Sequence, residues 1–338
     1  MTLNTYLNEI IYQDEPCVEL CAGGYYALFA PKIGGLMLRL KDVKNNFEIL
    51  RFSESVSMQS IRENPVVHGL PTLYLPNRLH NGLLKTSEKT YNLPINEPAF
   101  GNFIHGFLHL REYTVTKISV IEDSATVSAE YIYDEKDEFF KFLPISFKAI
   151  ITYTLSEKGL EQNFTIENLS TAVLPVGVAS HTAMNCIFSD NSNKDDLRIN
   201  INVDKKLPLN EHLVSTGELL ELNEYDLQYK NGTLNPLTTS IDNDMYSVLD
   251  VELNDKFFYG VKISDCKTGE TICYETGKEY KFWLLWNEWG NKGYCCPEPM
   301  SWMIDAPNLP LFDDKTGYVE LKKGEKWSGY QHIFSYKK

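Results

Sequence analysis

The chain has 338 residues, of which 43% are hydrophobic and 23% are charged. This length allows one large all-β domain, and the apolar content is enough for a sizeable core, so long disordered stretches are not expected. The 32 basic and 46 acidic residues give a net charge of −14. An acidic balance of this size argues against nucleic acid or an anionic membrane surface as a partner.

The seven cysteines form no CxxC pair and show no zinc-type spacing, which indicates reduced thiols rather than a metal site. The N-terminus lacks a basic region followed by an apolar run, and no stretch approaches the roughly 20 apolar residues of a membrane helix. We therefore expect a cytoplasmic protein, either a monomer or a homodimer.

Short apolar runs, separated by glycine, proline and acidic residues, open the chain at residues 9–12, 17–21, 25–30 and 36–40. Runs of this length and spacing predict β-strands joined by tight turns.

The regular pattern stops between Met58 and about Phe107, where five prolines occur and few runs are long enough for a strand. A long irregular segment inside a compact domain is usually functional or disordered, and the aromatic residues here argue against disorder. Arg78 and His105 are therefore candidate site residues. The alternatives are a surface charge for Arg78 and a turn residue for His105.

Alternation of apolar and polar residues resumes after Leu110 and is clear over residues 125–133. The pair Asn231-Gly232 predicts a hairpin turn. No segment has a sustained helical stripe, and no solenoid or propeller repeat is present. Many short strands over the whole length predict one large antiparallel β-sandwich domain spanning residues 1–338.

One carboxylate, Glu298, stands between Pro297 and Pro299, and four tryptophans (residues 283, 286, 289 and 302) lie within twenty residues of sequence. The prolines restrict the backbone and lack N–H groups, so this stretch predicts a rigid mount for one side chain rather than a ladder interior. A carboxylate among aromatic rings suits a sugar site, and a structural turn carboxylate is the alternative.

His181 follows the apolar run at residues 172–179, where it could be a core histidine or a proton donor at the end of a strand. Asp242 and Asp244 precede Tyr246 in a polar stretch. The oxygen-ligand spacing of a calcium loop is absent, so these aspartates belong either to a solvated loop or to a binding site.

Four motifs follow one another along the chain: Asn77-Arg78-Leu79, Asn102 to Gly106, Pro175 to His181, and Cys296 to Met300. In this order they resemble the aldose 1-epimerase (galactose mutarotase) family over nearly the whole chain. The resemblance implies a β-supersandwich fold, an aldohexose as the small-molecule partner, and a reaction that uses no metal and no cofactor.

By this resemblance, Arg78 would bind sugar hydroxyls, His105 would hydrogen-bond the ring oxygen or anomeric region, His181 would be the general acid and Glu298 the general base. Asp242 or Asp244 would be a further sugar contact, and Trp286 or Trp302 could pack on the ring face. Interconverting two anomers takes a proton from the C1 hydroxyl and delivers one to the ring oxygen. A carboxylate and an imidazole, with reference pKa values of about 4.3 and 6.5, suit that pair of tasks.

Three other functions remain open from the residues. A glycosidase would need a second carboxylate, such as Asp244, across the scissile bond from Glu298. A hexose-6-phosphate 1-epimerase would need additional arginines or lysines, which are sparse around Arg78. A non-catalytic carbohydrate-binding protein would have no need of a matched acid and base.

Overall fold

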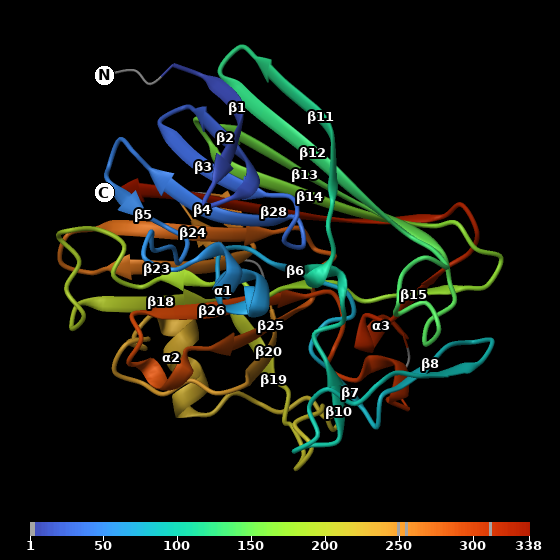
Figure 1. Ribbon diagram of the computed structural model, residues 1–338. Coiled ribbons are helices and arrows are strands. Elements are labelled where there is room, and N and C mark those ends of the chain that lie inside the picture. The colour runs from blue at the N-terminus through green and yellow to red at the C-terminus, as the bar shows by residue number, and fades with distance from the viewer. Residues whose placement is uncertain (1–3, 249–250, 254–255, 311–312) are drawn as a thin grey trace.

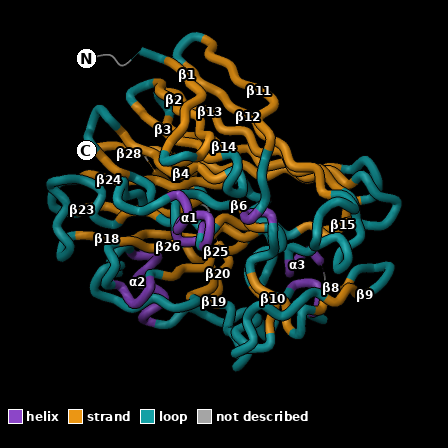
Figure 2. Tube along the Cα trace, viewed as in Figure 1, coloured by secondary structure: helices purple, strands orange, loops and turns teal. Residues whose placement is uncertain are grey.

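A computed structural model describes residues 4–248, 251–253, 256–310 and 313–338. Within these ranges the chain is dominated by antiparallel sheets, with a few short helices at their periphery (Figures 1 and 2). The predicted all-β, antiparallel fold class is confirmed.

The largest sheet has eight strands and contains the longest strands of the molecule. In spatial order these are β11 (Thr114–Ile121), β12 (Ser124–Tyr133), β13 (Phe147–Ser156), β14 (Gly159–Asn168), β28 (Lys326–Lys337), β24 (Glu270–Thr276), β23 (Gly260–Asp265) and β18 (Leu197–Ile201).

A second, seven-stranded sheet carries much of the candidate site. Its strands in spatial order are β19 (Val203–Lys206), β20 (Asp244–Val248), β25 (Phe282–Trp286), β26 (Tyr294–Met300), β16 (Ala179–Ser180) and β6 (Thr72–Leu73), with β17 (Met184–Asn185) also paired to β26.

The N-terminal strands form a five-stranded meander: β1 (Tyr6–Tyr12), β2 (Glu15–Ala22), β3 (Tyr25–Ala30), β4 (Leu36–Asp42) and β5 (Phe47–Glu48). The remaining strands pair in twos: β7 (Arg78–His80) with β10 (Asn102–Ile104), β8 (Leu83–Lys85) with β9 (Thr90–Asn92), β15 (Leu174–Val176) with β27 (Val319–Leu321), and β21 (Val251–Leu253) with β22 (Lys256–Phe258). The helices are α1 (Met58–Glu63), α2 (Glu224–Asn231) and α3 (Asp313–Thr316), with 3₁₀ turns at Pro65–Val67, Leu108–Leu110, Glu288–Gly290 and Ala306–Asn308.

Strand alternation in β12 shows how the sequence builds the core. Ala125, Val127 and Ala129 are fully buried, and the polar residues between them lie on the opposite, partly exposed face. The buried residues join the N-terminal meander in one continuous core with Val18 and Leu20 of β2. Burying an aliphatic side chain of valine or leucine size stabilises the fold by about 1.5–3 kcal/mol, so this face locks the two sheets together.

The segment from Met58 to Phe107 is ordered and consists of α1, a 3₁₀ turn and five short strands. Its strands β7 and β10 pair with Arg78 opposite Ile104, so Arg78 lies close to His105 although 27 residues separate them in sequence. The irregular stretch predicted between the strands therefore brings two candidate residues together.

Helix α2 was not predicted, and the predicted hairpin turn at Asn231-Gly232 is wrong. Asn223 begins the helix with a capping box, in which its side chain accepts from the Asp226 N–H and the Asp226 carboxylate accepts from the Asn223 N–H. Gly232 ends the helix at φ 64°, the left-handed conformation that glycine adopts without strain. Glycine thus serves a helix end here rather than a two-residue β-turn.

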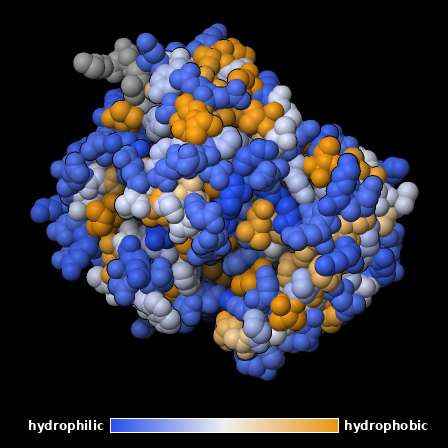
Figure 3. Space-filling view, in the orientation of Figure 1, coloured by the Kyte–Doolittle hydropathy of each residue, from blue (hydrophilic) through white to orange (hydrophobic). Residues whose placement is uncertain are grey.

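The face in Figure 3 is mostly polar, and apolar side chains gather at its top over β1 and β11. The exposed isoleucines of these two strands include Ile11 of β1 and Ile118 and Ile121 of β11. Among the described residues, no helix has the length and apolar character needed to cross a bilayer.

Candidate active site

A cavity of about 400 Å³ lies between the seven-stranded sheet and the 58–107 segment. Its polar lining residues are Asn64, Asn77, Arg78, Glu97, His105, His181, Asp242, Asn243 and Glu298. Five of the six residues predicted from sequence therefore converge on one cavity, although they are spread over more than 200 positions.

Glu298 enters the cavity from the middle of β26, opposite Leu284 of β25. Leu284, Trp286 and Glu298 all line the cavity, as expected for alternate residues of two paired strands that face the same way. Glu298 is 2% exposed, so its carboxyl group sits at the floor of the cavity.

The stretch around Glu298 was expected to avoid a ladder interior, and this expectation is wrong because β26 is a central strand. Its pairing explains how the sheet accepts two prolines. On one side β26 pairs continuously with β25, whereas on the other it meets β17 at Cys295 and β16 at Met300. Pro297 and Pro299 lie between those two contacts, where few backbone donors are needed.

His181 lies in the same gap, between β16 and β17. The N–H groups of His181 and Ala183 donate to the carbonyls of Pro71 and Gly69 rather than to β26. This detour places His181 Nε2 3.2 Å from Oε1 of Glu298. The interruption in the ladder therefore allows the contact between His181 and Glu298.

Burial acts on both members of this pair. It raises the pKa of Glu298 well above its ordinary value, against the opposing charge of Arg78. It lowers the pKa of His181 to about 4. A carboxylate with a raised pKa is a stronger base and an imidazolium with a lowered pKa is a stronger acid, and the same two shifts favour the neutral forms of both groups in the ligand-free cavity.

His105 packs edge-on against His181, with ring centroids 5.3 Å apart. Its φ of 66° is positive, and its N–H donates to the carbonyl of Asn77, which has a positive φ as well. Such backbone conformations are uncommon outside glycine and concentrate at functional sites. Gly106 follows because an added Cβ would lie 1.9 Å from the carbonyl oxygen of Tyr74.

Burial lowers the pKa of His105 well below its ordinary value, and His181 adds to this effect. Nδ1 of His105 has no hydrogen-bond partner among the described residues. That nitrogen is buried, whereas the residue lines the cavity as a neutral imidazole, a group whose two ring nitrogens are one hydrogen-bond donor and one acceptor.

Arg78 is held by Glu97, a residue that was not predicted as part of the site. Nε and Nη2 of Arg78 each donate to Glu97 at 2.9 Å, and Nη1 donates to the side-chain oxygen of Asn243 at 2.9 Å. Glu97 lies in a loop of the 58–107 segment. Its contacts with Arg78 and Asn102 depend on how the chain folds, and the spacing of these residues in the sequence does not reveal them. The one available signal was a Glu-Pro dipeptide at 97–98, which recurs at 298–299.

The two predicted aspartates have different surroundings. Asp242 is exposed, lines the cavity and accepts from the Asn243 side chain at 2.8 Å. Asp244 is outside the cavity lining, where Tyr225 and Tyr229 donate to one carboxylate oxygen and Lys206 donates to the other.

The two candidate tryptophans also separate. Trp286 lines the cavity, and its ring centroid is 5.9 Å from that of His181. Trp302 is fully buried and stacks on Tyr318, so the expectation that it could pack on a sugar ring is wrong.

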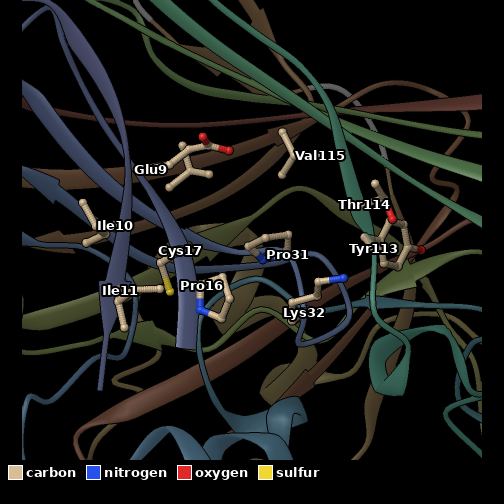
Figure 4. A pocket seen from close by; sticks show the side chains of 11 residues that line it. Glu9, Ile10, Ile11, Pro16, Cys17, Pro31, Lys32, Tyr113, Thr114 and Val115 are labelled. Atoms are coloured by element: carbon tan, nitrogen blue, oxygen red, sulfur yellow. The ribbon is translucent and has the colours of Figure 1, made fainter. Parts of the chain in front are cut away.

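A second cavity, of about 510 Å³, opens between β1, β2 and the start of β11 (Figure 4). Its lining is largely apolar, with Glu9 and Lys32 as its charged residues. Burial raises the pKa of its one thiol, Cys17, to about 12, so the thiol stays protonated at neutral pH. The described lining of this cleft contains no histidine and thus no counterpart of the His181–Glu298 contact.

Across the described part of the chain, no cluster of three or more histidine, cysteine or acidic side chains has an arrangement that could hold a metal ion.

Comparison with known proteins gives a consistent result. A family model described as aldose 1-epimerase matches residues 16–333. The solved structure of a galactose mutarotase-like protein from Clostridium acetobutylicum superposes with a TM-score of 0.96, at 32% identity and 99% coverage of both chains. The galactose 1-epimerase from Lactobacillus acidophilus shares the fold at a TM-score of 0.72, with 14% identity and 99% of both chains covered.

Among curated sequences, human galactose mutarotase is 27% identical over 143 residues, which cover 42% of this chain and 39% of the human protein. Protein LacX of Lactococcus lactis is 23% identical over 212 residues, covering 62% of this chain and 67% of LacX. These alignments span only part of the curated relatives, whereas the family model covers nearly all of this chain. The chain belongs to the aldose 1-epimerase family.

Proposed function

We propose that this protein is an aldose 1-epimerase that interconverts the α and β anomers of an aldohexose, with Glu298 as general base and His181 as general acid. The observation that carries the proposal is the contact of 3.2 Å between these two side chains at the floor of the cavity. A purely sugar-binding site would have no use for an acid and a base held against each other.

The proposed reaction moves two protons and breaks one ring bond. The Glu298 carboxylate removes the proton from the C1 hydroxyl, and the electron pair of that O–H bond becomes the second bond of the aldehyde carbonyl as the bond from C1 to the ring oxygen breaks and its electrons pass to that oxygen. His181 protonates the departing ring oxygen. Rotation about C1–C2 presents the other carbonyl face, and the reverse proton transfers close the ring.

This cycle uses the Glu298–His181 pair in the state that carries one proton in total. Burial opposes the charged forms of both residues, so in the ligand-free cavity the proton favours Glu298, and the cycle begins once it has passed to His181 across the 3.2 Å contact. A sugar that excludes water from the cavity would strengthen the polar contacts made there. No metal or cofactor takes part in any step.

The remaining lining residues would hold the sugar. Arg78 and Asp242 would hydrogen-bond hydroxyl groups, His105 would contact the ring oxygen or anomeric region through a ring nitrogen, and Trp286 would cover one face of the ring. Asp244 has both oxygens occupied, and we propose that it anchors the start of β20 so that Asp242 and Asn243 keep their places.

Exchange between the two anomeric proton signals in NMR, or polarimetry after dissolving a pure anomer, tests this proposal. The protein should accelerate equilibration of at least one aldohexose far above the buffer rate. A panel of galactose, glucose, their 6-phosphates and other aldoses should be used. A parent protein no faster than buffer on the entire panel would contradict catalysis and favour a sugar-binding role.

A further inference from the structure

The guanidinium of Arg78 does not face the cavity as a free cation. Glu97 grips it along one edge, with Nε 3.2 and 2.9 Å from the two carboxylate oxygens and Nη2 2.9 Å from Oε1. Paired contacts of this kind are the strongest and most directional that arginine makes. On the opposite edge, Nη1 donates to Asn243, so the guanidinium plane is fixed from two sides.

A hydrogen bond from the side chain of Asn102 fixes Glu97 in turn. The side-chain amide of Asn102 donates to Oε2 of Glu97 at 2.9 Å and to the backbone carbonyl of His212 at 2.8 Å. The side chain of Arg78 is 10% exposed and that of Glu97 is 18% exposed, so bulk water screens the pair only weakly. A surface ion pair of two mobile side chains would have neither this support nor this burial.

The charges around the cavity are unbalanced in one direction. Its described lining contains one arginine, no lysine and the carboxyl groups of Glu97, Asp242 and Glu298. Because Glu97 neutralises Arg78, no lining cation is left to compensate a charged ligand. A phosphate or carboxylate on the substrate would meet net negative charge.

We propose that Glu97 is a positioning and selectivity residue, which fixes Arg78 as a hydrogen-bond donor for sugar hydroxyls and cancels its charge so that anionic sugars are rejected. The identity of the ligand rests on the proposed function, whereas the charge cancellation rests only on the geometry. By this proposal, Arg78 recognises neutral hydroxyls because it is paired, and removing the pairing carboxylate would turn the same residue into an anion receptor.

The decisive variant is Glu97→Gln, which keeps the size and one acceptor oxygen but removes the negative charge. Titration calorimetry at low salt should show that glucuronate and inorganic phosphate bind this variant about tenfold or more tightly than they bind the parent, the size expected for one uncompensated charge at a partly buried site. The gain should shrink as salt is added. For a neutral aldohexose, KM should rise while kcat stays within about threefold.

Glu48→Gln is a matched control. Glu48 accepts from Nε and Nη2 of Arg39 at 2.9 and 2.7 Å, the same single-edge arrangement as Glu97 with Arg78, and neither Glu48 nor Arg39 lines the cavity. This control should gain no affinity for glucuronate. Equal gains in both variants, or no gain in a folded Glu97→Gln protein, would overturn the selectivity role.

Two further variants separate charge from position. Glu97→Asp keeps the charge but shortens the reach, so it should raise KM for the neutral sugar without gaining anion affinity, and it remains informative if the glutamine variant does not fold. In the double variant Arg78→Met/Glu97→Gln the anion gain should disappear, and its persistence would show that Arg78 is not the receptor. These binding measurements do not require turnover. A catalytically inactive parent would therefore contradict the proposed function, while the cancellation of the Arg78 charge by Glu97 could still be tested.

Discussion

Two contacts between a carboxyl group and a basic side chain lie in the described lining of the cavity, and they are built in opposite ways. At the rim, Arg78 and Glu97 share several hydrogen bonds, and each has a second supporting partner in Asn243 or Asn102. At the floor, His181 and Glu298 meet at 3.2 Å, and burial works against the charge of each. Hydrogen-bond partners therefore support the charges of the first contact, whereas burial disfavours the charges of the second.

The difference indicates where the molecule maintains structure and where it maintains reactivity. A well-supported ion pair is difficult to move and keeps its protons, which suits recognition. A buried pair whose pKa values are shifted against the charged forms is typical of functional sites and is unfavourable for stability. The following experiments test this comparison by changing the Arg78–Glu97 contact, the His181–Glu298 contact or the protonation of buried side chains.

The largest effect is expected at the floor. Glu298→Gln removes the base, so kcat for anomer exchange should fall by about 10²–10⁴-fold, with a much smaller change in KM. NMR exchange measurements give both parameters, and Glu48→Gln serves as the control for loss of a glutamate elsewhere. A variant as fast as the parent would remove Glu298 from the role of base.

At the rim, removal of Arg78 should damage the fold as well as binding. Arg78→Ala leaves Glu97 largely buried without its partner, which should lower the free energy of unfolding by about 2–4 kcal/mol and raise KM. Urea unfolding measures the first effect. The double variant Arg78→Met/Glu97→Gln should recover most of the lost stability. Failure to recover it would show that the unpaired charge of Glu97 is not the cause of the loss.

Acid should destabilise the protein through its buried histidines. Burial lowers the pKa of His68 and of His181 to about 4 and that of His109 to about 3. The unfolded chain therefore binds more protons between about pH 6.5 and pH 4, so stability falls as the pH falls through that window, by up to about 3 kcal/mol per histidine. Urea midpoints at a series of pH values test this, and His68→Asn should flatten the slope.

The smallest expected effect is on the free energy of unfolding, which should rise in Glu298→Gln and fall in Glu97→Gln. Because the pKa of Glu298 is raised, the folded state holds its proton more tightly than the unfolded state, and stability declines as the pH rises from about 4.5 through the folded pKa. Glu298→Gln should therefore be more stable than the parent by about 1 kcal/mol at pH 8, with a smaller gain at pH 5. Glu97→Gln should be less stable than the parent at both pH values. Thermal unfolding measures both variants, and a destabilised Glu298→Gln or a stabilised Glu97→Gln would contradict the prediction.

Local pattern sufficed for the all-β fold, because alternation such as that of residues 125–133 fixes which face of a strand is buried. Motif order sufficed for placing Arg78, His105, His181 and Glu298 as candidates, and the fold brings these four to one cavity with Asp242, one of the two aspartates that the sequence left open. Glu97 and Asn243 escaped notice since their significance lies in contacts with Arg78, made across 19 and 165 residues of sequence. No local signal carries such pairings.

Other predictions failed for identifiable reasons. Trp302 resembled a sugar-stacking residue by composition, but it fills the core against Gly177, where no larger residue would fit. The prolines beside Glu298 seemed incompatible with a central strand because the break in β26 pairing could not be read from its own sequence. Both errors arose from neighbours distant in sequence.

The division of the cavity between the 58–107 segment and the seven-stranded sheet also bears on how this enzyme family could change its preferences. Arg78, Glu97 and His105 all belong to the one contiguous segment, whereas Glu298 and Trp286 belong to paired strands of the sheet. A transplant of that single stretch from a relative would exchange the Arg78, Glu97 and His105 side of the cavity in one step and leave the strands that carry Glu298 and Trp286 in place, so it would separate the proposed recognition from the proposed proton transfer. Chimaeras joined near residues 58 and 107 are thus a compact route to altered sugar selectivity.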